Sequence, residues 1–346
     1  MRSGSAPLPL LFRTLVFDVN VPLSPGFCVH RGLDAIPERL LRGTLAIGNF
    51  DGVHAGHKAV IARTREIALD TDTESVALTF EPHPRTFFRP DLPVPRLTLA
   101  REKRLLLARE GLDGVVELTF DAELASLTAE EFVTRILVEK LQVVHVVVGH
   151  DFHFGKNRGG SPAFLQDAGK RHGFAVTVVE AFGAEGGAVV SSSLIREALR
   201  EGRVVEANRL LGHRWFVMGE VVHGDKRGRM LGYPTANIAL PPETPLAHGI
   251  YAVRVSVDGE THDGVASFGR RPTFAENGAE LLETYIFDFS RDLYGKTIAV
   301  EIVGFLRGEE KFSSAEALIE QMHRDAVAAL EILAAPMDPL ALSAIG

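Results

Sequence analysis

Apolar and polar residues follow two different patterns along the chain. Between Thr44 and Glu201, short continuous apolar runs alternate with stretches whose apolar residues recur at helical spacing. Runs without polar alternation are typical of strands covered on both faces. The expected strands are Leu45–Phe50, Val76–Phe80, Gly114–Phe120, Val143–Gly149 and Phe174–Ala181. The expected helices are His57–Leu69, Arg101–Arg109, Ala129–Leu141 (opened by a capping box of Thr128 and Glu131) and Pro162–His172. This alternation predicts an α/β domain with a doubly wound parallel sheet.

The pattern changes after Arg203. A short helical linker, Val204–Leu211, is followed by strand-like runs that Gly, Pro and Asp separate, with no long helix between them. These runs are Phe216–Val222, Tyr251–Val257, Thr261–Phe268, Glu283–Phe289 and Ile298–Leu306. They predict an antiparallel β-barrel or sandwich. A terminal helix is expected from about Ser314 to Leu333, with a capping box of Ser313 and Glu316. Its apolar stripe would consist of Ala315, Leu318, Ile319, Met322, Ala326, Ala329 and Leu330.

The length of 346 residues also fits two domains. We expect an N-terminal domain over residues 27–202, a C-terminal domain over residues 203–335 and a loose tail over residues 336–346. Residues 1–26 carry no motif, so they are expected to be a disordered extension or the product of a misassigned start codon. Prolines and an arginine interrupt the apolar core that a signal peptide needs, although a short targeting segment is an alternative.

Composition narrows the class of protein. Hydrophobic residues make up 46% of the chain, which is enough for buried cores. The formal net charge is −8, whereas nucleic-acid-binding proteins usually carry a basic surplus, so no nucleic-acid partner is expected. Cys28 is the only cysteine, which excludes an intrachain disulfide and fits a reducing cytoplasm. No apolar run approaches the roughly 20 residues that span a bilayer. We expect a cytoplasmic protein without membrane contact, and whether it forms a homo-oligomer stays open.

The sharpest local signal is the segment Ile47–His57, which follows a strand and opens a helix. Ligands bind at this position of open α/β sheets, and the first N–H groups of the helix can meet a phosphate. Gly52 and Gly56 let the backbone approach a ligand closely. His54 and His57 could both face one phosphate, where they would stabilise the charge that develops when its phosphorus is attacked. Two histidines at this spacing could instead cap the loop or bind a metal.

Three further segments of the first half contain candidate ligand groups. Phe80–Arg85 contains two prolines and a histidine, a pattern that is also typical of a rigid turn. Val148–Gly155 carries Asp151 after a strand. This second segment is not a P-loop, because its glycines are spaced too widely and Asn157 stands where Ser or Thr is required. Ser191–Arg196 opens a helix and is either a phosphate-binding motif or a plain N-cap.

In the second half, the segment Gly219–Asn237 combines four glycines with three basic residues. Such a loop can wrap a phosphate group, although it is not a Walker A sequence. Thr235 and Asn237 stand two apart on an extended strand and therefore face the same side. Their oxygens are of the kind that Mg²⁺ accepts beside substrate phosphates. The tetrapeptide alone could equally be the start of a strand.

Together these motifs resemble one family. The string His54-Ala55-Gly56-His57 resembles the HxGH signature of nucleotidyltransferases, and the longer Gly48–His57 resembles the bacterial riboflavin kinase/FMN adenylyltransferase family, also called bifunctional FAD synthetase. In the same way Val148–Gly155 is similar to the family's VGxDFxFG segment, Ser191–Arg196 to SSTxIR, and Pro234–Asn237 to the riboflavin kinase signature PTAN. The resemblance runs from about Phe27 to Leu333, with both motif sets in the family's order.

The resemblance implies roles for individual residues. The catalytic residues would be His54 and His57 in adenylyl transfer and Glu283 as the base in phosphorylation. The nucleotide-binding residues would be Gly48, Phe50, Gly56, Ser192, Ser193, Arg196, Gly224, Lys226, Arg229 and Gly232. The flavin-binding residues would be His83, Pro84, Phe87 and Asp151, and Thr235 and Asn237 would hold Mg²⁺. The chain departs from the family pattern at Ser193, His153 and Ser267, where Thr, Arg and Asn are expected.

The resemblance therefore implies a bifunctional enzyme that uses riboflavin, FMN and ATP as substrates and Mg²⁺ as cofactor. Its C-terminal half would phosphorylate riboflavin to FMN, and its N-terminal half would adenylylate FMN to FAD with release of pyrophosphate. One alternative is an adenylyltransferase for a pantetheine or nicotinate phosphate with a decayed second domain, against which Thr235, Asn237 and Glu283 speak. The other is a barrel that senses flavin or RNA without turnover. The negative net charge disfavours RNA binding, and the full set of phosphate-handling residues disfavours a pure sensor.

Overall fold

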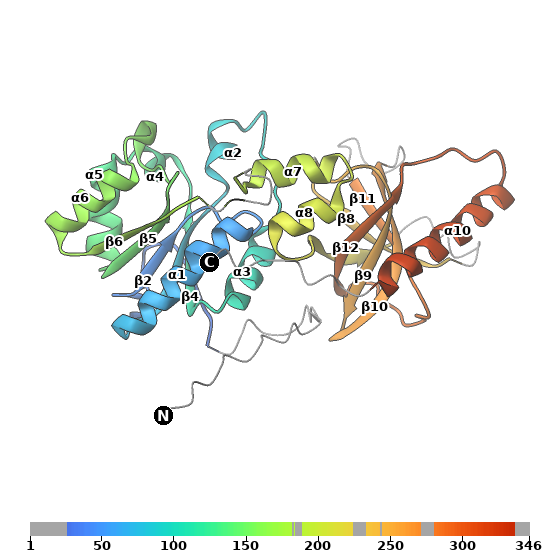
Figure 1. Cartoon of the computed structure of the whole chain (residues 1–346), viewed down its shortest axis with the longest axis horizontal. Coiled ribbons are helices and arrows are strands. Elements are labelled where there is room, and N and C mark those ends of the chain that lie inside the picture. Colours follow the sequence, from blue (N-terminus) through green and yellow to red (C-terminus); the bar gives the residue numbers. More distant parts are fainter. Residues whose placement is uncertain are drawn as a thin grey trace, which may run out of the picture.

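A computed structural model describes residues 26–181, 183, 189–223, 233–242, 244–270 and 280–335. In Figure 1, a sheet covered by helices lies at the left, a barrel lies at the right, and α7 (Ser192–Arg200) and α8 (Val204–Leu211) lie between them. Apart from Gly26, the expected extension lies outside the described residues, and so does the expected tail over residues 336–346. The two-part organisation that the sequence predicts is confirmed.

The first part is a parallel sheet of six strands in the order β1-β4-β3-β2-β5-β6. These strands are β1 (Cys28–Arg31), β2 (Thr44–Ile47), β3 (Ser75–Glu81), β4 (Gly114–Thr119), β5 (His145–Gly149) and β6 (Ala175–Val179). Five of them match the predicted apolar runs to within a few residues. The edge strand β1 was not predicted, because a strand of four half-exposed residues leaves no apolar run to recognise.

Alternate residues of the central strands enter two separate cores. Leu45 and Ile47 pack with residues of the helices at 129–141 and 162–172, whereas Ala46 packs with α1 (Ala55–Thr71) and α3 (Ala100–Arg109) on the opposite face. All four residues of β2 are buried. Both faces of each central strand are covered, and this explains the continuous apolar runs in the sequence, as expected.

The helices of this part largely follow the sequence prediction. They include α1 (Ala55–Thr71), α3 (Ala100–Arg109) and α6 (Pro162–His172), with the short α2 (Pro84–Phe88) and α4 (Ala122–Ser126) and the single turns η1 (Glu38–Leu40) and η3 (Lys156–Arg158). The predicted helix Ala129–Leu141 differs, because α5 (Ala129–Glu131) continues as the π-helix η2 (Phe132–Lys140). An α-helix and a π-helix show the same amphipathic pattern over one or two turns, so the sequence does not distinguish them. The capping box of Thr128 and Glu131 is confirmed.

The second part is a closed antiparallel barrel in the order β10-β11-β8-β7-β12-β9. Its strands are β7 (Phe216–Val222), β8 (Thr235–Leu240), β9 (Gly249–Val257), β10 (Glu260–Arg270), β11 (Glu280–Ile286) and β12 (Thr297–Arg307). The barrel prediction is confirmed. The strand predicted over Glu283–Phe289 begins and ends three residues earlier than expected, so Phe287 lies just beyond its end.

The terminal helix α10 (Ala315–Ala334) lies against the barrel, but two details of its prediction are wrong. Its N-cap is Ser314, which accepts a hydrogen bond from the Ala317 N–H, so Ser313 does not form a capping box with Glu316. The predicted stripe is only partly buried, with Leu330 47% exposed. A charged residue, Asp325, occupies the buried face instead, because its carboxylate pairs with the guanidinium of Arg307 on β12.

Two short helices join the parts. α7 (Ser192–Arg200) and α8 (Val204–Leu211) share one hydrophobic cluster with the interior of the barrel. Trp215, the residue before β7, donates a hydrogen bond from Nε1 to the Leu97 carbonyl at 2.8 Å. The Ala247 N–H also donates a hydrogen bond to the Leu199 carbonyl at 3.0 Å. We call this contact region between the two parts the seam. The residues on both sides of position 202 therefore pack together, and the domain boundary there stays a prediction. Among the described helices, none is both long and apolar enough to cross a membrane.

Candidate active sites

The turn between β2 and α1 brings the two predicted catalytic histidines side by side. Gly52 and Val53 have positive φ angles of 85° and 40°, which let the chain turn sharply before the helix. His54 is the N-cap of α1, and its Nδ1 accepts a hydrogen bond from the His57 backbone N–H at 3.4 Å. The two imidazole rings stack with their centroids 3.6 Å apart. A Cβ atom on Gly56 would lie 3.3 Å from the His54 ring, so glycine keeps this turn open.

Both histidines are uncharged near neutral pH. Burial lowers the pKa of His54 to about 4, although Asp51 and Asp151 oppose this shift. Burial also lowers the pKa of His57 well below its usual value, and the positive charge of Lys103 adds to the effect. Nδ1 of His57 is buried and has no hydrogen-bond partner among the described residues. An arriving phosphate would supply an acceptor and a negative charge, so the pair is arranged to donate hydrogen bonds to an anion.

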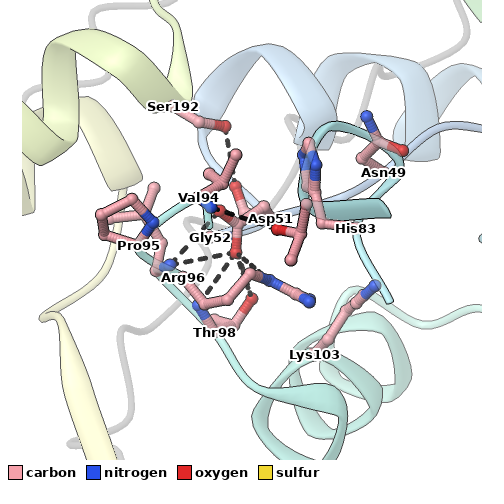
Figure 2. A network of polar contacts seen from close by, with 12 residues as sticks. Asn49, Asp51, Gly52, His83, Val94, Pro95, Arg96, Thr98, Lys103 and Ser192 are labelled. Carbon is pink, nitrogen blue, oxygen red and sulfur yellow. Dashed lines mark hydrogen bonds and ion pairs between the residues drawn. The ribbon is translucent and has the colours of Figure 1, made fainter. Parts of the chain in front are cut away.

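Asp51, in the same turn, joins three segments that are distant in the sequence (Figure 2). Its carboxylate is 1% exposed and accepts hydrogen bonds from the backbone N–H groups of Leu97 and Thr98, both at 3.0 Å. Arg196 on α7 forms an ion pair with its second oxygen. Burial alone would raise the pKa of Asp51, but Arg196 and Arg96 hold it below its usual value. A charged carboxylate thus fixes the turn that carries the histidines.

A second ion-paired group adjoins Asp51. Arg96 donates two hydrogen bonds to Glu81 at 2.9 and 3.0 Å, and Lys103 Nζ lies 2.7 Å from the same carboxylate. Burial would raise the pKa of Glu81, but these partners lower it to about 2. Lys103 is 1% exposed, and burial lowers its pKa. With Arg196, the cluster contains three cations against two carboxylates, so its net charge favours a phosphate.

The predicted second nucleotide motif lies against this turn. Ser192 donates a hydrogen bond from Oγ to the Asp51 carbonyl at 3.0 Å, which ties the start of α7 to the turn. Ser193 is exposed. Arg196 is 6% exposed, and its guanidinium is held by Asp51 and by a backbone carbonyl at 2.6 Å. The motif therefore lies against the turn that carries the histidines, with Arg196 partly engaged by protein groups, and its contact with ATP stays a prediction.

Two predicted nucleotide-binding positions precede the histidines. A Cβ atom on Gly48 would lie 3.2 Å from the Phe50 ring, which explains the glycine by packing alone. Phe50 is 1% exposed and meets the His57 ring edge-on with centroids 5.3 Å apart. In this arrangement Phe50 orients a histidine, and its contact with a nucleotide stays a prediction.

The four predicted flavin-binding residues lie around the same edge of the sheet. His83 caps α2 through a hydrogen bond that its Nδ1 accepts from the Arg85 N–H at 3.1 Å, and burial lowers its pKa to about 4. Pro84 opens that helix. Phe87 packs edge-on against Phe120 with centroids 5.5 Å apart, in a partly exposed aromatic cluster. Asp151 is exposed, and its charge acts on His54.

On the barrel, strand pairing sets the second candidate site. β8 and β11 are antiparallel partners, with Asn237 opposite Glu283 and Thr235 opposite Tyr285. Alternate residues of β8 enter the barrel core, so Thr235 and Asn237 lie together on the opposite face of the strand, and the prediction that they share one side is confirmed. Cross-strand neighbours on one face have Cβ atoms about 4.5–5.5 Å apart. Glu283 therefore stands next to the Asn237 amide.

The environment of this site fits the predicted roles. The Oδ1 atom of Asn237 is buried and has no hydrogen-bond partner among the described residues, so an oxygen ligand is available there for a cation. Tyr285 meets Phe287 and Tyr233 with centroids 5.7 and 4.8 Å apart, which forms an aromatic wall beside Glu283. The predicted phosphate-loop residues Gly224, Lys226, Arg229 and Gly232 lie outside the described residues.

Sequence reasoning did not identify Asp51, Glu81, Arg96 and Lys103 as part of the first site. Asp51 stands inside the recognised motif, but its partners are 45 or more positions away in the chain. Arg96 follows a proline-rich stretch. Lys103 lies on a helix whose apolar pattern does not single it out as a site residue. The only available signal for Lys103 was its spacing, which places this charged residue on the buried face of its helix.

Two family models match the chain, one described as FAD synthetase over residues 37–194 and one described as riboflavin kinase over residues 211–333. The chain is 45% identical over 308 residues to the bifunctional riboflavin kinase/FMN adenylyltransferase of Pseudomonas fluorescens, covering 88% of this chain and 97% of that protein. It is 40% identical over 303 residues to the protein of the same description from Escherichia coli strain K12, covering 87% and 96%.

A solved structure supports the fold over most of the chain. It is described as a macrolide-efflux protein from Streptococcus pneumoniae and matches with a TM-score of 0.75 and 31% identity, covering 87% of this chain and 97% of that one. Three findings indicate the same family: the order of the two sites along the chain, the two family models, and the sequence identities over nearly nine-tenths of the chain. The chain belongs to the bifunctional riboflavin kinase/FMN adenylyltransferase family.

Proposed function

We propose that the chain makes FAD in two steps at two separate sites. It is a riboflavin kinase and FMN adenylyltransferase by family, with riboflavin, FMN and ATP as substrates. The kinase step would take place on the outer face of the barrel and the adenylyl transfer at the β2–α1 turn. The main support is that stacked His54 and His57 lie in one domain, whereas the Asn237–Glu283 pair lies in the other.

In the adenylyl transfer, a phosphate oxygen of FMN attacks the α-phosphorus of ATP. The bond from that phosphorus to the bridging oxygen breaks, and pyrophosphate leaves. Negative charge grows on the α-phosphate oxygens in the transition state, and the N–H groups of His54 and His57 are proposed to stabilise it. The aromatic cluster of Phe87 and Phe120 would support the flavin ring, with His83 and Asp151 at its polar edge.

In the kinase step, the primary hydroxyl of riboflavin attacks the γ-phosphorus of ATP and ADP leaves. The hydroxyl is a weak nucleophile, and Glu283 is proposed to orient it and accept its proton. The aromatic wall of Tyr285 and Phe287 would hold the isoalloxazine beside this carboxylate. Thr235 and Asn237 would hold Mg²⁺, which neutralises phosphate charge when bound. The Oδ1 atom of Asn237, which has no hydrogen-bond partner in the part of the chain that the structure describes, supports that assignment.

A product analysis tests the proposal. Purified protein incubated with riboflavin, ATP and Mg²⁺ should form FMN first and FAD afterwards, as resolved by chromatography. Chelation of the metal should stop both steps, and metal should restore them. Turnover of pantetheine phosphate in place of FMN would favour a different adenylyltransferase, and flavin binding without any product would favour a sensor.

A further inference from the structure

The terminal helix α10 is fastened to the barrel by polar contacts with two strands. Asp325 of α10, which is 6% exposed, accepts hydrogen bonds from Arg307 of β12 at 2.9 and 2.7 Å. In the last turn of the helix, the Leu333 carbonyl accepts a hydrogen bond from Arg254 of β9 at 2.9 Å. Figure 1 shows the helix along the outside of the barrel. A side chain that α10 directs towards the kinase site therefore comes from a fixed support.

One end of the aromatic wall packs against this helix. Phe287, just beyond β11, packs against an apolar cluster in which Ala252 of β9 meets Ala329 and Leu333 of α10. The ring of Phe287 in turn meets that of Tyr285 with centroids 5.7 Å apart. The helix therefore supports this end of the wall by apolar packing.

The other end of the wall is tied to α10 by a hydrogen bond. The Tyr233 hydroxyl and Nδ1 of His323 lie 2.7 Å apart, although the two residues are 90 positions apart in the chain. Tyr233 is 7% exposed, and its ring centroid lies 4.8 Å from that of Tyr285. His323 is exposed on the helix. A hydrogen bond at the tip of a side chain locks its rotamer, so the orientation of Tyr233 depends on His323.

We infer that His323 is a positioning residue for riboflavin phosphorylation, which holds Tyr233 so that the wall presents a preformed surface to the isoalloxazine ring. This inference rests on the proposed function of the barrel. Binding to a surface that is already ordered avoids the cost of ordering its side chains. Because His323 acts through Tyr233 and not on the reacting atoms, its loss should weaken flavin binding and leave the chemical step nearly unchanged. His323 belongs to none of the sequence motifs identified above.

Titration of the full chain with riboflavin, in the presence of ADP and Mg²⁺, tests this inference through the quenching of flavin fluorescence. His323→Phe keeps an aromatic ring and removes the hydrogen bond, so the dissociation constant of riboflavin should rise by about 3–10-fold. In steady-state FMN formation, KM should rise by a similar factor while kcat stays within about 2-fold of the parent. His323→Asn should recover most of the affinity, because its amide can reach the position of Nδ1.

The matched control is Arg324→Gln. Arg324 is the exposed neighbour of His323 on α10, and it pairs with Glu320 and Gln321 of the same helix. Loss of an exposed ion pair within one helix has little effect, so riboflavin affinity should stay at the parent value. FAD formation from supplied FMN should be unchanged in every variant, which shows that the chain is folded.

A double-mutant cycle identifies the partner of His323. Tyr233→Phe should weaken riboflavin binding, and addition of His323→Phe to it should weaken binding no further, because both changes remove the same hydrogen bond. Additive losses, riboflavin affinity in His323→Phe equal to that in Arg324→Gln, or a fall in kcat at unchanged affinity would each overturn the inference. Absence of FMN formation by the parent protein would instead contradict the proposed function, and the riboflavin titrations would still report on the pair of Tyr233 and His323.

Discussion

At the β2–α1 turn, two histidines are backed by charged groups from residues 51, 81, 96, 103 and 196, which lie far apart in the chain. On the barrel, Thr235, Asn237 and Glu283 are set side by side by the pairing of two strands. The first arrangement depends on buried ion pairs, which are costly unless every charge is matched. The second depends on strand register, which the hydrophobic alternation of β8 and β11 already specifies. One chain thus positions two phosphate-transfer sites by two different physical means.

The difference predicts how each site responds to damage. Removal of one charge from the first site leaves its partners buried and unpaired, so stability and activity should fall together. Removal of a side chain from the outer face of the barrel leaves the strand pairing intact, so activity should fall alone. The variants that follow separate these two outcomes.

The largest effect is expected on the barrel, for Glu283→Gln. This change keeps the size of the side chain and removes its basicity, and a positioned base contributes about 10²–10⁴-fold in rate. Riboflavin phosphorylation should fall by about that factor, as measured by FMN formation at saturating ATP. FAD formation from supplied FMN should persist, and the thermal unfolding temperature should change little. Near-normal FMN formation would remove Glu283 from the mechanism and leave Asp263 and Asp288 as the next carboxylates to test.

The second effect concerns the histidine pair. A positioned donor that stabilises transition-state charge is worth about 10²–10³-fold in rate, so replacement of both His54 and His57 by Ala should lower FAD formation by about that factor. FMN formation should stay within a few-fold of the parent, because Glu283 and Asn237 belong to the other domain. An equal loss of both activities would show that the turn is needed for folding of the whole chain.

The two sites also differ in how far the sequence reveals them. That Thr235 and Asn237 share one face follows from the two-residue period of a strand, and β8 obeys it. The stacked histidines follow from a short motif at a strand-to-helix turn. The partners of Asp51 do not follow from the sequence, because an ion pair between residues 51 and 196 leaves no local periodicity. The buried Asp325 of α10 was missed for the same reason, since its partner Arg307 lies on another element.

The third prediction examines the buried charges directly through Asp51→Asn. Breaking a buried ion pair on one side typically costs about 3–5 kcal/mol, because the remaining charge is uncompensated. The variant should therefore unfold at lower urea concentration and lose FAD formation. Trp215, the only tryptophan, is buried at the seam between the domains and reports the transition by fluorescence.

Glu117→Gln supplies the matched control for Asp51→Asn. Glu117 is 4% exposed in the same sheet and is held by Arg104 at 2.8 and 2.6 Å, away from the histidines. We expect a comparable loss of stability with FAD formation retained in the folded protein. Equal activity losses in the two variants would mean that Asp51 acts on the reaction only through global stability.

The smallest expected effect is a dependence of stability on pH that comes mainly from buried histidines. Burial lowers the pKa of His54 and His83 from 6.5 to about 4, and it lowers those of His57, His145 and His213 in the same direction. Because the unfolded chain binds these protons near pH 6.5 and the folded chain does not, the stabilisation is complete above that pH. It is lost as the pH falls from 6.5 towards 4.

For His54 alone, a shift from 6.5 to about 4 corresponds to about 3 kcal/mol. Two buried carboxyl groups at the seam, Glu102 and Glu301, oppose this trend, because burial raises their pKa values and protonation stabilises the fold. The free energy of unfolding should therefore fall between pH 7 and pH 5, as measured through Trp215 fluorescence. His54→Gln should show a shallower pH dependence over this range, because it lacks one of the titrating groups. If the slope in His54→Gln equals that of the parent, the imidazole binds its proton equally well in the folded and unfolded chains, which would contradict a lowered pKa for His54.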